Sequence, residues 1–302
     1  MVQTVISMDK LRNRWIDEGV VVIEDLFDVS EIKKVQIDFE KMYGDASQSK
    51  DRYEANHTGS ESELYKNQFE FIDTLPFQAS VDMNLLSLHP KLIDLSRKLL
   101  NSADIQLYQS HTWAKFGERA DYNQYLHCDF NNHTLTVPSI GINVEAVNYL
   151  IYLSDVSEEN GPFRYVNKKD SNKVLGERFL NVDKKKYVKL EEKEKPVYGK
   201  AGTVIAYSLD TFHRGTNLTK KKGHRYSMSV SYKLARTNSI GFHVWQVSPK
   251  RDWSQIINNG SPDQLGCLGI PTPGSSFWNE ITIKQTEARW PGWNAKPYKE
   301  RI

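Results

Sequence analysis

The stretch YSMSVSYK, residues 226–233, alternates between large side chains and small or charged ones along its whole length. Successive side chains of a β-strand point to opposite faces of a sheet, so this alternation predicts a strand with one apolar face. The large residues on that face are Tyr226, Met228, Val230 and Tyr232. The sequence therefore predicts a sheet that packs one face against an apolar core and turns a polar face the other way.

Short strand patterns recur from about residue 104 onward, and turns separate them. They are IQLYQSHTWAKF (105–116), YLHCDF (125–130), VNYLIYL (147–153), FRYV (163–166) and GTVIAYS (202–208). Before them, the chain shows apolar residues at helical spacing and one buried-strand run, VVVI (20–23). Several short strands after a helical start favour an antiparallel sandwich or barrel with helices packed outside it.

The length of 302 residues suits a single domain, because sandwiches and barrels of about 200–250 residues commonly form one unit. We expect a helical part at about 1–103, a strand core at about 104–235 and a C-terminal arm at 236–302. The arm holds five of the seven tryptophans but shows no periodic pattern. It is predicted to be irregular and to wrap around the core.

Two polar segments are predicted to lie outside the core. Residues 45–68 are rich in turn formers, which is typical of a long loop that covers a site. Residues 167–198 include the charged run KKKYVKLEEKEKP and predict a solvated insertion between strands. We expect residues 45–68 to close over a binding site when a ligand enters. Residues 167–198 are a second candidate for the same role.

Charge and composition exclude several classes of partner. With 40 basic and 38 acidic residues the formal charge is +2, which gives no support to nucleic acid or an anionic membrane as the main partner. No apolar run reaches the ~18 residues of a transmembrane helix, and the N-terminus lacks a signal-peptide pattern. Cys128 and Cys267 are too few for a disulfide framework. These features predict a cytoplasmic protein and leave its oligomeric state unknown.

The stretch YLHCDFNNHTL, residues 125–135, places His127 and Asp129 two positions apart. The pair alone is a weak signal, since a chain with eight histidines and 38 acidic residues contains one by chance. On a strand, however, residues two apart point to the same face, so both side chains would project together from a rigid scaffold. Cys128 would then face the other side, as a packing residue.

A third candidate ligand, His213, lies far downstream. Residues 201–233 predict a strand, a turn that carries His213, a basic loop and then the alternating strand. Two histidines and one carboxylate form the facial triad that holds non-haem Fe(II) and leaves three coordination positions open. The same ligand types also occur in zinc hydrolases, so the triad by itself leaves the reaction open.

Arg225 supplies what an organic co-substrate of such an iron site needs. A 2-oxo acid that chelates iron through its keto acid end leaves a distal carboxylate, and a guanidinium binds that group with two parallel hydrogen bonds. Arg225 has the same phase along the strand as Ser227, so both are expected to face one cavity. A zinc hydrolase would not need this arginine. The adjacent Lys221, Lys222 and His224 are interpreted as a solvated charge run.

Four blocks in order resemble the phytanoyl-CoA dioxygenase family of Fe(II)/2-oxoglutarate-dependent oxygenases. They are His127-x-Asp129, NYLIYLSDVSEENGPFRYV (148–166), GTVIAYSLDTFHRGTN (202–217) and GHRYSMSVSYK (223–233). The resemblance covers about residues 8–235 and leaves the C-terminal arm outside. It implies a mainly β fold with flanking helices: a double-stranded β-helix, the cupin-like jelly roll, with the N-terminal helices packed on one sheet.

By this resemblance, His127, Asp129 and His213 are the iron ligands, and Arg225 binds the distal carboxylate of 2-oxoglutarate. Lys115, in HTWAKFG, is similar in place to a lysine that family members hold near the co-substrate.

The chain departs from the family pattern at two places. Residues 167–171, NKKDS, stand where many members have a Pro-Gly-Ser-His turn at the pocket rim. Gly215 stands where some members carry a serine that helps bind 2-oxoglutarate, and Thr216 or Ser227 are the candidates to replace it. Neither departure affects the metal ligands.

The resemblance implies an oxidoreductase that hydroxylates a small-molecule metabolite, with Fe(II) as cofactor, 2-oxoglutarate and O₂ as co-substrates, and succinate and CO₂ as products. Related halogenases have Gly or Ala in place of the carboxylate, so Asp129 argues against halogenation. The alternative is a non-catalytic metal-binding protein of the cupin type. The sequence does not identify the substrate, and no stretch resembles a coenzyme A site.

Overall fold

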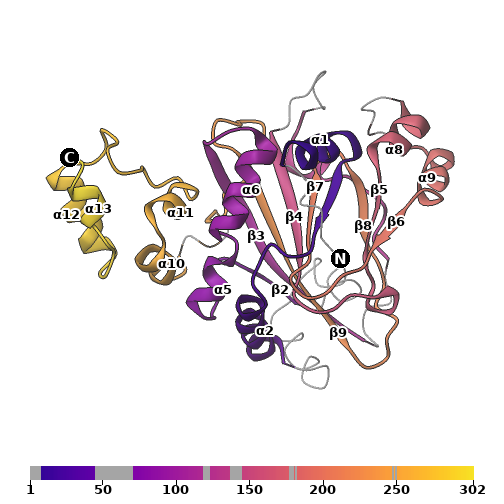
Figure 1. Ribbon diagram of the computed structural model, residues 1–302, viewed down its shortest axis with the longest axis horizontal. Helices are drawn as coiled ribbons and strands as arrows, with labels where there is room; N and C mark the ends of the chain where they lie inside the picture. The colour runs from indigo at the N-terminus through magenta and orange to yellow at the C-terminus, as the bar shows by residue number, and fades with distance from the viewer. Residues whose placement is uncertain are drawn as a thin grey trace.

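Two antiparallel sheets form the centre of the computed structural model (Figure 1). The structure describes residues 8–44, 71–117, 123–136, 145–176, 180, 182–246, 248 and 250–302. The strands are β1 (Val20–Ile23), β2 (Phe71–Thr74), β3 (Ile105–Phe116), β4 (Ala146–Tyr152), β5 (Phe163–Val166), β6 (Lys195–Val197), β7 (Val204–Ser208), β8 (Phe212–Gly215) and β9 (His224–Leu234). The helices are α1 (Met8–Glu18), α2 (Val29–Tyr43), α5 (Val81–Leu86), α6 (Pro90–Leu100), α7 (Phe130–His133), α8 (Lys168–Leu175), α9 (Lys184–Glu191), α10 (Ser254–Asn259), α11 (Pro262–Gly266), α12 (Glu280–Arg289) and α13 (Lys296–Lys299), with a short 3₁₀ turn at Glu158–Asn160. Within these ranges no helix is both long and apolar enough to cross a membrane.

The larger sheet has six strands in the order β1-β7-β4-β9-β3-β2, and the smaller sheet has three in the order β6-β5-β8. All paired strands run antiparallel. Side chains from both sheets line one cavity, so the two sheets face each other. The predicted mainly β fold with flanking helices, a cupin-like jelly roll, is confirmed.

The outer face of the six-stranded sheet forms the main core. Tyr226, Met228, Val230 and Tyr232 are all buried there, as the alternation along β9 predicts. The same apolar cluster includes buried side chains of α1, α2, α5 and α6, so the N-terminal helices pack on this face. Because burying one large apolar side chain contributes about 1.5–3 kcal/mol, this layer makes the sheet a rigid support for its inner face.

The inner face of the same sheet is polar and positions the site. Side chains that share a face lie in rows across neighbouring strands, and the strand register fixes which residues share a row. From one end of the sheet to the other, the rows are Gln109–Ser231–Asn148–Tyr207, Thr74–His111–Ser229–Leu150, Ile72–Trp113–Ser227–Tyr152 and Lys115–Arg225.

Of the two polar segments predicted to lie outside the core, the structure describes mainly the second. The predicted 45–68 loop lies outside the described residues. Residues 167–198 are not only a solvated insertion, because they contain α8, α9 and β6 and bury Leu175 and Leu190. These two side chains pack in one apolar cluster with Cys128, beside the chain that carries the first two candidate ligands. The segment therefore supports that chain from behind, and none of its described residues lines the cavity.

The C-terminal arm is the main correction to the predicted fold, since the described part of residues 236–302 contains four short helices instead of irregular chain. Each helix has 10 residues or fewer, which is too short to show a clear apolar period. Local caps start two of them: Ser261 caps α11 and Asn279 caps α12. Figure 1 shows α12 and α13 at the end of the molecule remote from the sheets.

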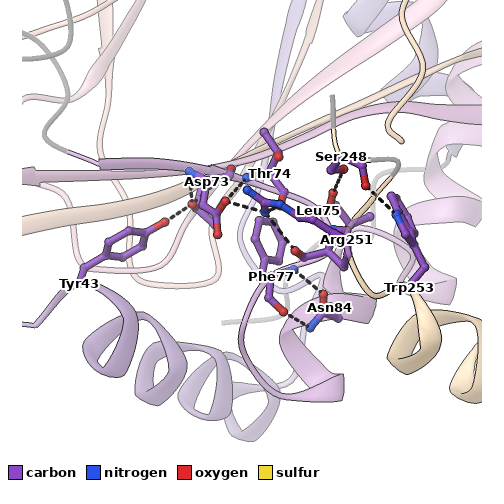
Figure 2. Close-up of polar contacts among 11 residues, drawn as sticks. Tyr43, Asp73, Thr74, Leu75, Phe77, Asn84, Ser248, Arg251 and Trp253 are labelled. Carbon is purple, nitrogen blue, oxygen red and sulfur yellow. Dashed lines mark hydrogen bonds and ion pairs between the residues drawn. The ribbon is translucent and has the colours of Figure 1, made fainter. Parts of the chain in front are cut away.

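The first part of the arm fastens β2, the edge strand of the large sheet (Figure 2). The guanidinium of Arg251 donates to Asp73 Oδ1 at 2.8 Å and to the carbonyl oxygen of Thr74 at 2.6 Å. The Ser248 hydroxyl donates to the carbonyl oxygen of Leu75 at 2.5 Å. The indole N–H of Trp253 in turn donates to the Ser248 carbonyl. Backbone acceptors that an edge strand leaves open are thereby occupied.

Candidate metal centre

The sequence predicts that His127 and Asp129 lie on one regular strand, and this prediction is wrong. His127 makes a single β-bridge with His213, and Asp129 already has helical backbone angles (φ −71°, ψ −15°) at the start of α7. Cys128 points to the opposite side and is buried, as predicted. Side chains alternate between the two sides for these three residues only, because α7 begins at Phe130.

His213 lies on β8, not in the predicted turn. The turn comes earlier, at residues 209–210, and β8 pairs with β5 in the small sheet. Backbone hydrogen bonds in both directions join His213 to His127, with N···O distances of 2.7 and 3.0 Å. The bridge places the two rings side by side, with their centroids 4.5 Å apart. Strand pairing, not the local sequence, therefore brings the distant ligand to the first pair.

The three side chains converge. Asp129 Oδ1 lies 3.7 Å from Nε2 of His127 and 3.7 Å from Nε2 of His213. One candidate ligand atom from each of the three residues lies within 4.8 Å of the other two. Two nitrogens and one oxygen at this separation can bind one metal ion on a single face and leave the other face open.

Each imidazole is oriented by its second nitrogen. Nδ1 of His127 lies 2.8 Å from the Tyr125 carbonyl oxygen, and Nδ1 of His213 lies 2.9 Å from the Thr211 carbonyl oxygen. A carbonyl accepts only, so both Nδ1 atoms carry the proton and both Nε2 atoms present a lone pair to the centre. Burial lowers the pKa of His213 to about 4, so this ring is neutral and able to bind metal at physiological pH.

The second carboxylate oxygen of Asp129 is held from the large sheet. Asn148 Nδ2 donates to Asp129 Oδ2 at 2.7 Å, and the Tyr207 hydroxyl donates to the same oxygen at 3.3 Å. Burial would raise the pKa of Asp129, but the facing imidazoles, led by His213, outweigh it and hold the pKa below its ordinary value. The carboxylate is therefore charged, with Oδ1 left for a metal.

The triad opens into a cavity of about 440 Å³ between the two sheets. This volume lies within the usual range for small-molecule sites. Its lining residues are Ile72, Thr74, Gln109, His111, Trp113, Gln124, His127, Asp129, His133, Leu150, Phe163, Tyr207, His213, Gly215, Arg225, Ser227 and Ser229.

Arg225 lies buried in the wall of this cavity, as the sequence predicts. One guanidinium nitrogen donates to the Gly161 carbonyl, while Nε is buried and has no hydrogen-bond partner among the described residues. No carboxylate of the described residues forms an ion pair with Arg225, and burial lowers its pKa. Ser227, in the next row, also has a buried hydroxyl without a partner in the described chain. A buried cation with open donors in a cavity can bind an anion.

Lys115 and Thr216 lie next to Arg225 but do not line the cavity. Lys115 pairs with Arg225 across β3 and β9, and its ammonium group donates to the Thr216 carbonyl oxygen at 2.9 Å. Burial, and secondarily Arg225, lowers the pKa of Lys115 well below its ordinary value. The Thr216 hydroxyl donates to the Pro162 carbonyl at 2.6 Å, so its donor is already occupied. Of the two candidates for the missing serine, only Ser227 faces the cavity.

Several site residues were not recognised in the sequence. Asn148 and Tyr207 hold Asp129, and Phe163 stacks on the His213 ring with centroids 5.2 Å apart. The available signal was the alternation in NYLIYL, where Asn148 and Leu150 share the inner face. The contact of Asn148 with Asp129 depends on the register between strands, and a single sequence does not show that register.

The family model for phytanoyl-CoA dioxygenase matches residues 15–225 of the chain. The match contains all three triad residues and ends at Arg225. The C-terminal arm lies outside it. The comparison with curated proteins gave no match.

Three solved structures illustrate the fold similarity. EctD from S. alaskensis with 2-oxoglutarate and 5-hydroxyectoine is 21% identical, with a TM-score of 0.59 over 84% of each chain. The non-heme alpha ketoglutarate dependent carbocyclase SnoK from nogalamycin biosynthesis is 17% identical, with a TM-score of 0.57 over 80% of this chain and 89% of that one. The epimerase SnoN in complex with Fe³⁺, alpha ketoglutarate and nogalamycin RO is 17% identical, with a TM-score of 0.51 over 75% and 83%.

Proposed function

Because this chain belongs to the phytanoyl-CoA dioxygenase family, we propose that it is an Fe(II)- and 2-oxoglutarate-dependent dioxygenase that hydroxylates a small-molecule metabolite. The observation that carries the proposal is one shared cavity. It joins a neutral-imidazole, carboxylate triad to a buried arginine that has open donors and no counter-ion in the described chain.

The donor set fits the metal. His127 Nε2, His213 Nε2 and Asp129 Oδ1 are the atoms we propose to bind iron(II), since their other polar atoms are already hydrogen-bonded. Because Asn148 donates to Oδ2, Asp129 would bind the metal through Oδ1, and the three protein ligands would leave room for 2-oxoglutarate and O₂. When bound, iron(II) and 2-oxoglutarate supply the O₂-dependent oxidation of an unactivated C–H bond.

The open donors fit the co-substrate. We propose that Arg225 binds the distal carboxylate of 2-oxoglutarate, with the Ser227 hydroxyl as a second donor in the neighbouring row. Lys115, one strand away, donates to the Thr216 carbonyl behind the pocket and does not line it. These residues bind one end of the co-substrate, so its keto acid end faces the triad.

The apolar walls have a separate role. Leu150, Phe163 and Tyr207 line the same cavity as Arg225 and the triad. They exclude water from the reacting centre, and this strengthens the charged hydrogen bonds around it and suppresses side reactions.

In the proposed reaction, one oxygen atom of O₂ enters the substrate as a hydroxyl group and the other enters succinate, while 2-oxoglutarate loses CO₂. The solved structures of similar fold include a carbocyclase and an epimerase, so the fold alone does not select the outcome. Hydroxylation is proposed because it needs no group beyond those named, and Asp129 occupies the position that a halogenase leaves open. We retain the cytoplasmic location as part of the proposal, since Cys128 and Cys267 are both free and buried.

The test is to measure succinate and CO₂ formed from 2-oxoglutarate by purified protein with added Fe(II) and O₂. We expect product that requires Fe(II) and that disappears in the Asp129→Ala variant. A metabolite extract analysed by mass spectrometry should then show a species that gains one oxygen atom only when 2-oxoglutarate is present. Iron binding without any Fe(II)-dependent succinate would instead favour a non-catalytic metal-binding protein.

A further inference from the structure

The part of the cavity farthest from the triad along the large sheet is built by β2, β3 and β9. The triad is held from β4 and β7 through Asn148 and Tyr207, and β9 separates these strands from β3 and β2. The side chains that line this part come from two adjacent rows of the sheet. The rows are Thr74–His111–Ser229 and Ile72–Trp113–Ser227.

Besides Ser227, which the proposed function uses, two polar side chains in these rows have hydrogen-bonding groups left open to the cavity. In the described chain, neither ring nitrogen of His111 has a hydrogen-bond partner, although the ring lies near that of Trp113 with centroids 6.1 Å apart. The Thr74 hydroxyl is likewise without a protein partner in the described ranges, and Thr74 is the register neighbour of His111. Open donors and acceptors that face a cavity are expected to be satisfied by water or by a ligand.

Trp113 is an aromatic side chain in the cavity wall beside them. Its indole N–H donates to the Ser229 hydroxyl at 2.7 Å, which holds the ring in one orientation against the sheet. An apolar part of a ligand can pack against the part of Trp113 that lines the cavity, with little loss of side-chain freedom.

The described lining of the cavity carries little charge. Its acidic, lysine and arginine side chains are Asp129 and Arg225 alone, and the proposed function uses both. Burial lowers the pKa of His111 to about 4, so this ring is neutral and has one donor and one acceptor nitrogen at physiological pH. An ion placed against Thr74 and His111 would lose its water and find no opposite charge on the described walls.

We propose that Thr74, His111 and Trp113 form the substrate subsite, and that it takes an uncharged molecule, or an uncharged part of one. The bound group carries an apolar part next to an amide or hydroxyl, which exchanges hydrogen bonds with His111 and Thr74. This inference rests on the proposed function and adds its substrate class. Because 2-oxoglutarate shares the cavity of about 440 Å³, the buried part of the substrate is small. A phosphate, carboxylate or ammonium group of the substrate is not expected to lie against Thr74 and His111.

The subsite is held from outside the cavity as well. Figure 2 shows Arg251 and Ser248 of the C-terminal arm bound to the segment that carries Thr74. On the other side of the strand, the amide N–H of Asp73 donates to the Thr112 hydroxyl at 3.1 Å, which also contacts Tyr43. Thr74 is therefore fixed opposite His111 before any ligand binds, as a preorganised site requires.

Three probes of one skeleton test the proposed charge preference: 3-phenylpropanamide, 3-phenylpropanoate and 3-phenylpropylamine. The amide and the carboxylate are nearly the same shape, so they differ mainly in charge. Binding is measured by saturation-transfer NMR on protein that carries Zn(II), as a redox-inactive stand-in for iron, and 2-oxoglutarate. We expect the amide to bind at least about tenfold more tightly than either ion, because the ions are desolvated without a partner. Equal or tighter binding of an ion, or no binding of the amide at millimolar concentration, overturns the proposal.

Variants locate the binding within the cavity. His111→Phe and Thr74→Val should each weaken amide binding by about 3- to 10-fold through loss of a hydrogen bond, while His111→Gln should retain it. His243→Phe, a histidine outside the cavity lining, is the matched control and should bind like the wild type. Thermal unfolding of each variant checks the fold. Unchanged amide binding in folded His111→Phe and Thr74→Val overturns the assignment to these residues.

A repeat of the titration without metal and 2-oxoglutarate separates the two proposals. Amide binding that depends on His111 supports the subsite even if the protein does not bind 2-oxoglutarate. If the wild-type protein does not bind 2-oxoglutarate, the proposed function is refuted, but the subsite is not.

Discussion

Asn148 donates a 2.7 Å hydrogen bond to Oδ2 of Asp129, and Oδ1 of the same carboxylate lies 3.7 Å from Nε2 of each triad histidine. The side-chain amide of Asn148 is itself held, because its Oδ1 accepts from the Tyr108 hydroxyl at 3.1 Å. The large sheet thus sets which carboxylate oxygen faces the two histidines.

Replacing Asn148 should weaken metal binding without removing a ligand. In Asn148→Ala the carboxylate can rotate, and we expect Fe(II) affinity to fall by about 10- to 100-fold, as for other residues that orient metal ligands. Anaerobic competition with a coloured chelator measures this affinity. Tyr207→Phe should have a smaller effect, since its hydrogen bond is the longer one at 3.3 Å. Wild-type affinity in a folded Asn148→Ala protein would show that Asn148 does not orient Asp129.

Replacing Arg225 should separate co-substrate binding from metal binding. Arg225→Leu leaves the distal carboxylate of 2-oxoglutarate without its partner, at a cost of about 2–5 kcal/mol, so Kd should rise roughly 30-fold or more. Arg225→Lys keeps the charge but loses the paired hydrogen bonds, so its Kd for 2-oxoglutarate should lie between those of the wild type and Arg225→Leu. Calorimetry gives the dissociation constants of 2-oxoglutarate and of Fe(II). An equal loss of Fe(II) binding in Arg225→Leu would indicate a structural role instead.

His111 should make stability depend on pH. Burial, and to a smaller extent His133, lowers the pKa of His111 from the ordinary value of 6.5 to about 4, so the folded state favours the neutral ring. This contribution to stability is fully present above pH 6.5 and is lost as the pH falls toward 4, because the unfolded chain binds the proton first. We expect the Tm of metal-free wild type to fall more steeply than that of His111→Gln between pH 7 and 4.5. Parallel curves would contradict the lowered pKa.

Arg251 should control the edge strand from outside the cavity. In Arg251→Ala, β2 loses the hydrogen bonds that the guanidinium makes to Asp73 and to the Thr74 carbonyl. We expect faster amide hydrogen exchange in residues 71–77 and a loss of about 1 kcal/mol in the free energy of unfolding, since the pair is partly exposed. Arg236→Ala, an exposed arginine of the same arm, is the control. If residues 71–77 exchange at the wild-type rate in Arg251→Ala, the arm does not fasten β2.

The sequence predicted those features that depend on local pattern. The alternation in residues 226–233 correctly predicted which side chains of β9 enter the core and that Arg225 and Ser227 face the cavity. The His127-x-Asp129 spacing identified two residues that do converge with His213. The regular strand expected around them was wrong, because α7 starts directly after Asp129.

Other features depend on contacts between distant segments, and a local pattern cannot show them. Pairing of β8 with the chain at His127 creates the triad, and the register of β4 with β7 and β9 brings Asn148 to Asp129. The Thr216 hydroxyl was a reasonable candidate for co-substrate binding, yet the nearby Pro162 carbonyl accepts its hydrogen bond. The helices of the arm start at local caps in segments too short to show a period.

The central claim is that the triad and Arg225 together bind 2-oxoglutarate through a metal ion. The most direct test is an anaerobic calorimetric titration of 2-oxoglutarate into the protein with and without Fe(II), repeated with Asp129→Ala and His213→Ala. We predict one site per chain that is tight only when Fe(II) is present, with no such binding in either variant. Equal binding of 2-oxoglutarate with and without Fe(II), or Fe(II)-dependent binding that persists in both variants, would contradict the claim.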